Sequence, residues 1–364
     1  MEIDERIEEI TEELRSTPYN KATEHHIGRL KAKLARLREE AEKRSSSRGG
    51  GNRDNVGRVG DATVILIGPP SVGKSTLLNK LTSAKAEVGA YDFTTIEVKP
   101  GILEYEGAKI QILDVPGLIK GLRGGGREVA SFTRSSDLVV LMTDILHVNV
   151  FEETERELYK VGIRLNQKKP RILVKKKITG GIKINSTVNQ DISEETIKEV
   201  LKEYKMHNAD VILRETIDIN GLIDALMKNR VYLSCVRVIN KIDMLEDQNL
   251  ITTKDTSIGE KYNAIMISAE AGINLEELKE SIFKRLNLIK VYMKHKGEEP
   301  DYKEPMILKK GSTVEEICRK IHRDFVEKFR YAKVWGNSVK YGGQMVGLSH
   351  EVYDGDVVNI SIER

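Results

Sequence analysis

The 364-residue chain lacks the features on which several protein classes depend. Its two cysteines, Cys235 and Cys318, lie far apart and form no metal-ligand spacing, so we expect reduced core residues rather than a disulfide framework. No apolar run approaches the roughly 18 residues of a membrane-spanning helix. The acidic start, MEIDERIEEI, has no apolar segment of the secretory type. These absences predict a cytoplasmic protein without a membrane partner.

A strong excess of charge is also missing. Lysine and arginine number 59 against 56 aspartates and glutamates, which gives a formal net charge of +3. An excess this small does not by itself indicate a nucleic-acid partner, so only a local cluster of basic residues would do so. The length exceeds what one hydrophobic core usually needs and favours two or three domains.

Apolar periodicity predicts a helical region at the N-terminus. Isoleucines and leucines recur at 3-4-3 spacing in two stretches, which indicates an antiparallel helical hairpin over residues 1–45, with Asn20 as a helix cap. Its helices either pack only on each other or form an arm that binds a partner. The Ser/Gly/Arg-rich residues 46–60 cannot bury apolar surface and predict a flexible linker.

Short β-rich runs then alternate with helical segments. This pattern predicts an α/β domain over 61–165 and 228–290, with a mostly parallel sheet covered by helices on both faces and a last helix over 274–289. The gap in this domain is longer than one crossover helix requires, so residues 166–227 predict an inserted α+β subdomain. Residues 291–364 predict a small mixed β-sheet wrapped on one Ser/Thr-capped helix.

A glycine-rich turn after the first strand of the α/β domain carries the clearest chemical signal. Residues 68–75, GPPSVGKS, match the P-loop pattern between a strand and a helix. The glycines let backbone N–H groups face phosphate oxygens, Lys74 adds a point charge, and the Ser75 hydroxyl is a Mg²⁺ ligand in such sites. The residues expected to bind nucleotide here are Gly68, Pro69, Pro70, Ser71, Val72, Gly73, Lys74, Ser75 and Thr76.

Two later motifs indicate which base is bound. N-K-I-D, residues 240–243, ends a later strand of the same sheet, and SAEAG, residues 268–272, follows the next one. The Asp243 carboxylate can accept from the guanine N1–H and 2-amino group, donors that adenine lacks, while the stem of Lys241 can cover the base. The expected guanine-contacting residues are Asn240, Lys241, Asp243, Ser268 and Ala269.

Between these motifs lie residues expected to sense the γ-phosphate. LDVPG ends a strand with Asp114, placed to hold Mg²⁺ through a water molecule, and continues to Gly117, whose backbone N–H can meet the γ-phosphate. Thr94 and Thr95 are adjacent hydroxyls, of which one should complete the Mg²⁺ shell. The order of the motifs predicts a GTPase that binds GTP, GDP and Mg²⁺.

The stretches GPPSVGKSTLLNKLT and YDFTTIEVKPGILEYEGAKIQILDVPGLIKG resemble the Obg-like GTPases, most of all their DRG branch (developmentally regulated GTP-binding proteins) in its archaeal form. The resemblance spans nearly the whole chain. It implies a helical N-terminal region, a GTPase domain, an insertion after VGIRLN and a C-terminal TGS domain with a ubiquitin-like β-grasp. It also implies Thr95 rather than Thr94 as the Mg²⁺ ligand, and a role around the ribosome and translation.

The residue that orients the attacking water in many GTPases is absent. A glutamine often follows the D-x-x-G turn, but residues 118–120 here are Leu, Ile and Lys. We therefore expect slow hydrolysis that relies on Mg²⁺, Lys74, Thr95 and the backbone of Gly117, with room for a protein cofactor. Potassium stimulation stays open, because some relatives hold potassium through a P-loop Asn where this chain has Ser71 at the nearest candidate position.

Basic residues do cluster in one stretch of the insertion. Residues 158–190 contain no Asp or Glu, while the centre is crowded with Lys168, Lys169, Arg171, Lys175, Lys176, Lys177 and Lys183. One interpretation is a solvated edge that discourages strand pairing. The other is a phosphate-facing patch for ribosomal RNA, which would bind with steep salt dependence and without specificity for a DNA sequence.

Three functions are compatible with these motifs. The first is a slow GTPase switch that acts on the ribosome or the translation machinery. The second is a P-loop enzyme that transfers phosphate to a small molecule, against which N-K-I-D counts. The third is an RNA-binding adaptor in which bound GTP is mainly structural.

Overall fold

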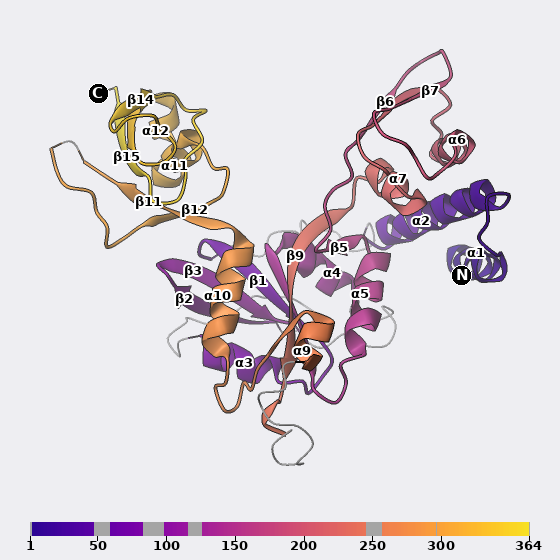
Figure 1. Cartoon of the computed structure of the whole chain (residues 1–364), viewed down its shortest axis with the longest axis horizontal. Coiled ribbons are helices and arrows are strands. Elements are labelled where there is room, and N and C mark those ends of the chain that lie inside the picture. Colours follow the sequence, from indigo (N-terminus) through magenta and orange to yellow (C-terminus); the bar gives the residue numbers. More distant parts are fainter. Residues whose placement is uncertain are drawn as a thin grey trace. The chain divides into compact units, whose positions relative to one another are not determined.

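The computed structural model describes residues 2–46, 59–82, 98–115, 126–244, 257–295 and 297–363 (Figure 1). Most of the predicted linker, residues 47–58, lies outside them. The chain divides into two compact units. Unit 1 is Met1–Arg53 with Leu158–Tyr232, and unit 2 is Asp54–Glu157 with Leu233–Arg364.

The N-terminal helices of unit 1 form a hairpin. α1 (Glu2–Ser16) and α2 (Glu24–Ser46) meet along an apolar seam whose buried members are Ile10, Leu30, Leu34 and Leu37. Asn20 lies in the turn before α2, where its side-chain oxygen accepts two backbone N–H groups at 2.9 Å. The 3-4-3 spacing of the sequence therefore corresponds to the face on which each helix is buried.

The insertion in unit 1 is a three-stranded sheet with two helices. The strands β6 (Ile172–Lys176), β7 (Ile182–Ser186) and β8 (Ala209–Leu213) run in the order β6-β8-β7. β8 is antiparallel to β6 and parallel to β7. The helices α6 (Glu194–Glu203) and α7 (Ile219–Leu226) form one apolar cluster with the inner face of the sheet. The sequence had not predicted β8 or α7.

The N-terminal hairpin and the insertion share a hydrophobic core, although the sequence analysis predicted them as two separate regions, residues 1–45 and 166–227. Figure 1 shows α2 beside α6 and α7. Ala32 of α2 is fully buried in the cluster formed by α6 and α7. A Cβ atom on Gly28 would come within 3.0 Å of Thr196 Cγ2, and Arg36 donates to the carbonyl of Glu203 at 2.7 Å. The helical hairpin is thus part of unit 1 rather than a separate arm.

The main sheet of unit 2 has the strand order β10-β9-β4-β1-β3-β2. Its parallel strands are β1 (Ala62–Ile67), β3 (Ala108–Asp114), β4 (Leu138–Asp144), β9 (Val231–Asn240) and β10 (Ala264–Met266). β2 (Lys99–Tyr105) is an antiparallel edge strand that the sequence had not predicted. Every residue of β1 and β4 is buried, as expected for strands covered on both faces, and the predicted α/β class is confirmed.

Helices α3 (Lys74–Leu81) and α10 (Leu275–Leu286) contribute leucines and isoleucines to one cluster with the strands of this sheet. Unit 2 also contains α4 (Gly126–Ser135), α9 (Ser257–Tyr262) and most of α5 (Val150–Lys160). β5 (Ile163–Leu165) lies just beyond α5, within unit 1. Within the described ranges, no helix combines the length and the apolar content needed to cross a membrane.

The C-terminal part is a mixed sheet packed on one main helix. Its strands are β11 (Leu288–Met293), β12 (Met306–Lys309), β13 (Phe329–Trp335), β14 (Gln344–Val346) and β15 (Val357–Ile362), in the order β12-β11-β15-β13-β14. The helix α11 (Val314–Ile321) packs on this sheet and is followed by the short α12 (Asp324–Glu327). Thr313 occupies the N-cap position of α11, but its side chain makes no cap hydrogen bond with any described residue.

The helix predicted over residues 274–289 ends earlier than expected. Asn287 adopts a left-handed φ of 51°, and its N–H bonds to the carbonyl of Lys284. Leu288 then begins β11 and contributes to the core of the main sheet. The prediction was wrong for these last residues because Leu288 continues the apolar spacing of the helix although it belongs to a strand.

Candidate nucleotide-binding site

Three loops of unit 2 follow the carboxyl ends of parallel strands. The P-loop, residues 68–73, follows β1, the loop of residues 240–243 follows β9, and the loop of residues 268–272 follows β10. In open α/β sheets ligands bind at this edge. Hydrogen bonds of the Asn240 side chain join the three loops, so the structure brings the predicted motifs together.

The P-loop backbone adopts a conformation and a packing that call for glycine at two positions. Gly73 has a φ of 94° and is the N-cap residue of α3. A Cβ atom at Gly73 would lie 2.4 Å from Asn240 Nδ2, and one at Gly68 would lie 2.1 Å from the carbonyl oxygen of Met142. The first turn of α3, which the structure describes in full, contains no acidic side chain. The loop and the helix start therefore offer N–H groups and a helix dipole to an anion.

Lys74 is a buried cation within this loop. Its side chain is 7% exposed, and its Nζ donates to the carbonyl oxygens of Gly68 at 3.0 Å and Pro69 at 2.7 Å. Burial lowers the pKa of Lys74, and the carboxylate of Asp114 opposes that shift in part. The protein alone thus leaves the ammonium under-stabilised, and a phosphate group would supply the anion that favours its charged form.

Two of the predicted Mg²⁺ ligands lie in contact. The hydroxyl of Ser75, at the start of α3, donates to Asp114 Oδ2 at 2.5 Å. Asp114 ends β3 and is 6% exposed. A hydroxyl and a carboxylate at this distance are oxygen ligands of the kind that Mg²⁺ prefers. Thr95 and Gly117, the other residues predicted to contact the metal or the γ-phosphate, lie outside the described residues.

Asn240 joins two of the loops. Its Nδ2 donates to the carbonyl of Val72 in the P-loop, and its Oδ1 accepts from the N–H of Ala269, each at 2.8 Å. The side chain is 3% exposed. The sequence placed Asn240 among the guanine-contacting residues but did not indicate this bridge, because neither partner is near it in the chain. The bridge fixes the P-loop and the loop of residues 268–272 to the loop of residues 240–243, which we call the base loop.

Asp243 presents an unsatisfied acceptor in the base loop. Its Oδ1 is buried and has no hydrogen-bond partner within the part of the chain that the structure describes. The preceding Ile242 is 2% exposed, and its N–H donates to the carbonyl of Ile267 at 3.3 Å, which anchors the loop. A buried acceptor without a donor costs free energy, so a ligand with N–H groups in the right place would bind here favourably.

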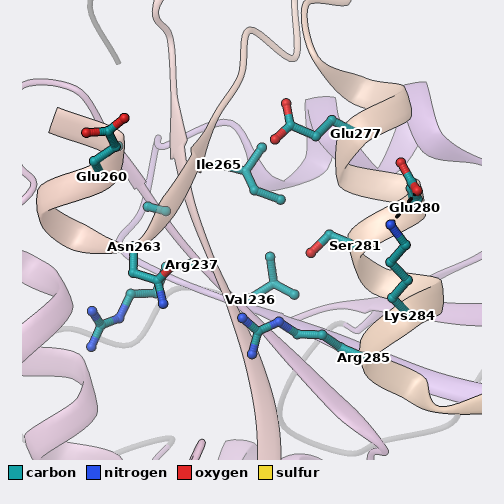
Figure 2. Close-up of a pocket in the computed structure, with 12 residues that line it drawn as sticks. Val236, Arg237, Glu260, Asn263, Ile265, Glu277, Glu280, Ser281, Lys284 and Arg285 are labelled. Carbon is teal, nitrogen blue, oxygen red and sulfur yellow. Dashed lines mark ion pairs between the residues drawn. The ribbon is translucent and has the colours of Figure 1, made fainter. Parts of the chain in front are cut away.

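A separate cavity of about 570 Å³ lies between α9, α10, β9 and β10 (Figure 2). Its walls carry both signs of charge, and Glu280 and Lys284 form an ion pair along α10. Val236 and Ile265 supply apolar side chains from the two strands. None of its lining residues belongs to the three nucleotide loops, so the assignment of the nucleotide site does not depend on this cavity.

Models of three protein families match successive parts of the chain. The model described as a 50S ribosome-binding GTPase matches residues 63–177, and that described as the C-terminal region of the MMR_HSR1 domain matches residues 179–288. The TGS domain model matches residues 289–362. The P-loop and Asp114 fall in the first match, and the C-terminal mixed sheet is the predicted TGS domain.

Similar proteins extend over the whole chain. A GTP-binding protein of Methanocaldococcus jannaschii, described as uncharacterized, is 52% identical, with 100% of this chain and 94% of that protein covered. Developmentally-regulated GTP-binding protein 2 of Homo sapiens is 44% identical, with 99% of each covered. The solved G-domain of FeoB from Methanococcus jannaschii is 18% identical, with a TM-score of 0.32 over 63% of this chain and 99% of that one, which is too low to bear on function. The full-length identities show that the chain belongs to the DRG family of GTP-binding proteins.

Proposed function

We propose that this protein binds GTP and GDP, hydrolyses GTP slowly with Mg²⁺, and works as a switch on the ribosome. The observation that carries the nucleotide assignment is the buried Asp243 Oδ1 in the base loop, which has no hydrogen-bond partner among the described residues. Guanine supplies the missing donors through its N1–H and 2-amino group, whereas adenine has neither on that edge. The presence of a P-loop on the same sheet accounts for the phosphates.

The phosphate end of the site is built for charge. Lys74, the backbone of residues 68–73 and the start of α3 would contact the phosphates, and Ser75 and Asp114 would hold Mg²⁺. The family resemblance adds Thr95 to the Mg²⁺ ligands. When bound, Mg²⁺ neutralises charge on the phosphate oxygens. Residues 118–120 contain no amide side chain to orient water, so turnover should lie in the range of unassisted switches, about 10⁻⁴ to 10⁻² s⁻¹.

The nucleotide proposal is tested by Asp243→Asn. The amide replaces one acceptor oxygen by a donor, which suits xanthine rather than guanine. We expect GDP affinity to fall by on the order of 10²-fold and the GDP-over-XDP preference to reverse, measured by equilibrium binding. Glu270→Gln is the control, because Glu270 is an exposed carboxylate in the neighbouring loop. An unchanged preference in a folded Asp243→Asn variant would contradict the assignment.

The ribosome is proposed as the partner on two grounds. The matching GTPase family model is described as ribosome-binding. The outer strands of the inserted sheet also present exposed lysines, among them Lys175, Lys176 and Lys183. Exposed lysines suit the phosphates of ribosomal RNA, and such binding is salt-dependent and weakly specific for sequence.

The sheet is less basic than the sequence stretch that forms two of its strands. Asp210 on β8 pairs in register with Lys175 on β6 and with Lys183 on β7, and it forms an ion pair with Lys177. Arg171 likewise lies 3.1 Å from a carboxylate oxygen of Glu215. The acid-free stretch of residues 158–190 therefore becomes a patch with carboxylates between its cations. Of the exposed sheet lysines, Lys175 and Lys183 flank Asp210, whereas Lys176 stands opposite Ala209.

A second function, an RNA-binding adaptor with structural GTP, is favoured by the same exposed lysines. Co-sedimentation with 50S subunits in the presence of GDP or a non-hydrolysable GTP analogue separates the two functions. The switch predicts binding that depends on the nucleotide, because a switch has two states with different affinities for its partner. Equal binding in both states would favour the adaptor, and no binding in either would contradict the ribosomal proposal.

A further inference from the structure

The nearly buried carboxylate of Asp144 lies at the end of the strand next to β9 and is not part of any predicted motif. Asp144 is the last residue of β4, and it stands in register with Asn240, the first residue of N-K-I-D. Its side chain is 11% exposed. A carboxylate so little exposed to water requires partners.

The partners of Asp144 divide between its two oxygens. Oδ1 accepts from the N–H of Leu146 at 3.1 Å and lies 2.7 Å from His147 Nδ1, within the turn that follows β4. Oδ2 faces the base loop instead, 3.9 Å from Lys241 Nζ. The second oxygen therefore links the end of β4 to the lysine whose stem is expected to cover the guanine base.

Two features of the structure direct the side chain of Lys241. Its backbone has a left-handed φ of 63°, which sets the direction in which the side chain leaves the loop. Its ammonium is attracted to Asp144 at the other end. The four-carbon stem of a lysine is otherwise flexible, and ordering it when the ligand binds would cost affinity. Holding the stem in place before binding removes part of that cost.

We propose that Asp144 is a positioning residue of the nucleotide site, which holds the ammonium of Lys241 so that the stem lies ready to cover the base. This inference rests on the proposed guanine-nucleotide binding. Asp144 acts through Lys241 and does not read the edge of the base, which is the task of Asp243. Its loss should therefore weaken all purine nucleotides that the site accepts without changing the preference among them.

The test is a double-mutant cycle on GDP affinity. Asp144→Asn keeps the size of the side chain and an oxygen for the N–H of Leu146, but it removes the charge that attracts Lys241. We expect Asp144→Asn to weaken GDP binding about 3- to 5-fold, the upper end of the range for a partly exposed ion pair. In a Lys241→Met background, which keeps a stem without the charge, Asp144→Asn should change the affinity less than about twofold.

A matched control is present at the other end of the same strand. Asp137, just before β4, has a side chain 10% exposed, accepts from the N–H of Thr63 at 2.9 Å and pairs with Lys309. Asp137→Asn should leave GDP affinity unchanged. An equal loss in Asp137→Asn, an equal loss in the Lys241→Met background, or no loss in the wild-type background would each overturn the positioning role. Failure of the wild-type protein to bind GDP would instead overturn the proposed function.

A change in base preference would also count against the inference. In the Asp243→Asn background, Asp144→Asn should weaken XDP by the same factor by which it weakens GDP in the wild-type background. Unequal factors would show that Asp144 takes part in reading the base, and thermal unfolding of each variant verifies that the fold is intact.

Discussion

Short stretches of sequence predicted both the nucleotide loops of unit 2 and the basic sheet of unit 1, formed by β6, β7 and β8. The two regions differ in whether the predicting stretch contains all the charged residues of the site. The P-loop pattern ends with three consecutive residues at the start of α3, namely Gly73, Lys74 and Ser75, so the local backbone places them in one site. The charge of the basic sheet depends on β8, which lies further along the chain and inserts Asp210 between the two lysine-bearing strands. A local motif predicts chemistry well, whereas a surface patch depends on strand pairing.

The largest effect is expected from Lys74→Ala, which removes the buried cation of the P-loop. In the proposed mechanism this charge acts where phosphate charge develops in the transition state, so kcat/KM for GTP hydrolysis should fall by on the order of 10²- to 10³-fold. Phosphate release measures the loss. Lys80→Ala, at an exposed position of the same helix, should leave the rate unchanged. A loss below about tenfold in a folded protein would mean that the loop does not need this lysine.

The next effect concerns the core of unit 1 and is measured as stability. Gly28 of α2 lies so close to α6 that its absent Cβ atom would meet Thr196 Cγ2 at 3.0 Å and Val200 Cγ2 at 3.3 Å. Gly28→Leu should lower the free energy of unfolding of unit 1 by about 1–3 kcal/mol through overpacking. Chemical denaturation followed by circular dichroism measures it.

The exposed position Lys33 provides the control on the same helix. Lys33→Leu should stay within about 0.5 kcal/mol of the wild type. GDP affinity should stay unchanged in both variants, because the nucleotide loops belong to unit 2. A Gly28→Leu protein as stable as the wild type would show that α2 does not form a common core with α6.

The sequence predicted the contents of the nucleotide loops better than the contacts between them. The P-loop pattern and N-K-I-D identify residues by type and spacing, which short-range backbone geometry then realises. The bridge from Asn240 to Val72 and Ala269 was missed because it joins residues far apart in the chain. Asp144 was missed for the same reason, since in the sequence it is an ordinary strand end.

The fold shows the same division between local and distant information. The buried strand β1 is a continuous apolar run and was predicted. β8 and α7 were not, because both are short. β8 has five residues, and α7 has eight, in which Ile219, Leu222 and Ile223 show helical spacing over only two turns. The end of α10 was placed too late because apolar spacing does not distinguish a helix end from the first residues of the strand that follows it.

A smaller effect is expected in the pH dependence of GTP binding. Burial lowers the pKa of Lys74 in the nucleotide-free protein, and bound phosphates would raise it again. At a pH between the pKa of Lys74 in the free protein and its pKa in the GTP complex, GTP binding is accompanied by uptake of at most one proton. The affinity for GTP should therefore fall as pH rises above the lower of these two pKa values. Calorimetry in two buffers of different ionisation enthalpy measures the uptake.

The sign for stability is the opposite in the nucleotide-free protein. A lowered folded-state pKa means that the unfolded chain binds more protons between the folded and unfolded pKa values. The cost of burying Lys74 is therefore complete below the lowered pKa, decreases as pH rises above it, and disappears above the ordinary lysine pKa of the unfolded chain. Lys74→Arg stays charged throughout and should bind without proton uptake. The same uptake in Lys74→Arg would assign the proton to another group.

The smallest expected effect tests whether β8 neutralises part of the basic sheet. Lys175 is exposed, whereas Lys177 already forms an ion pair with Asp210. If the sheet binds ribosomal RNA, Lys175→Gln should reduce the slope of log K against log [salt] by about 0.7 to 0.9, the value for one phosphate contact, and Lys177→Gln should reduce it less. Asp210→Asn should raise the affinity, because it removes a negative charge from between the two lysine-bearing strands. Filter binding of 50S subunits across a salt series measures all three variants. Slopes and affinities equal to those of the wild type throughout would identify the sheet as a solvated edge, and equal reductions in Lys175→Gln and Lys177→Gln would show that the carboxylate of Asp210 does not shield its partner.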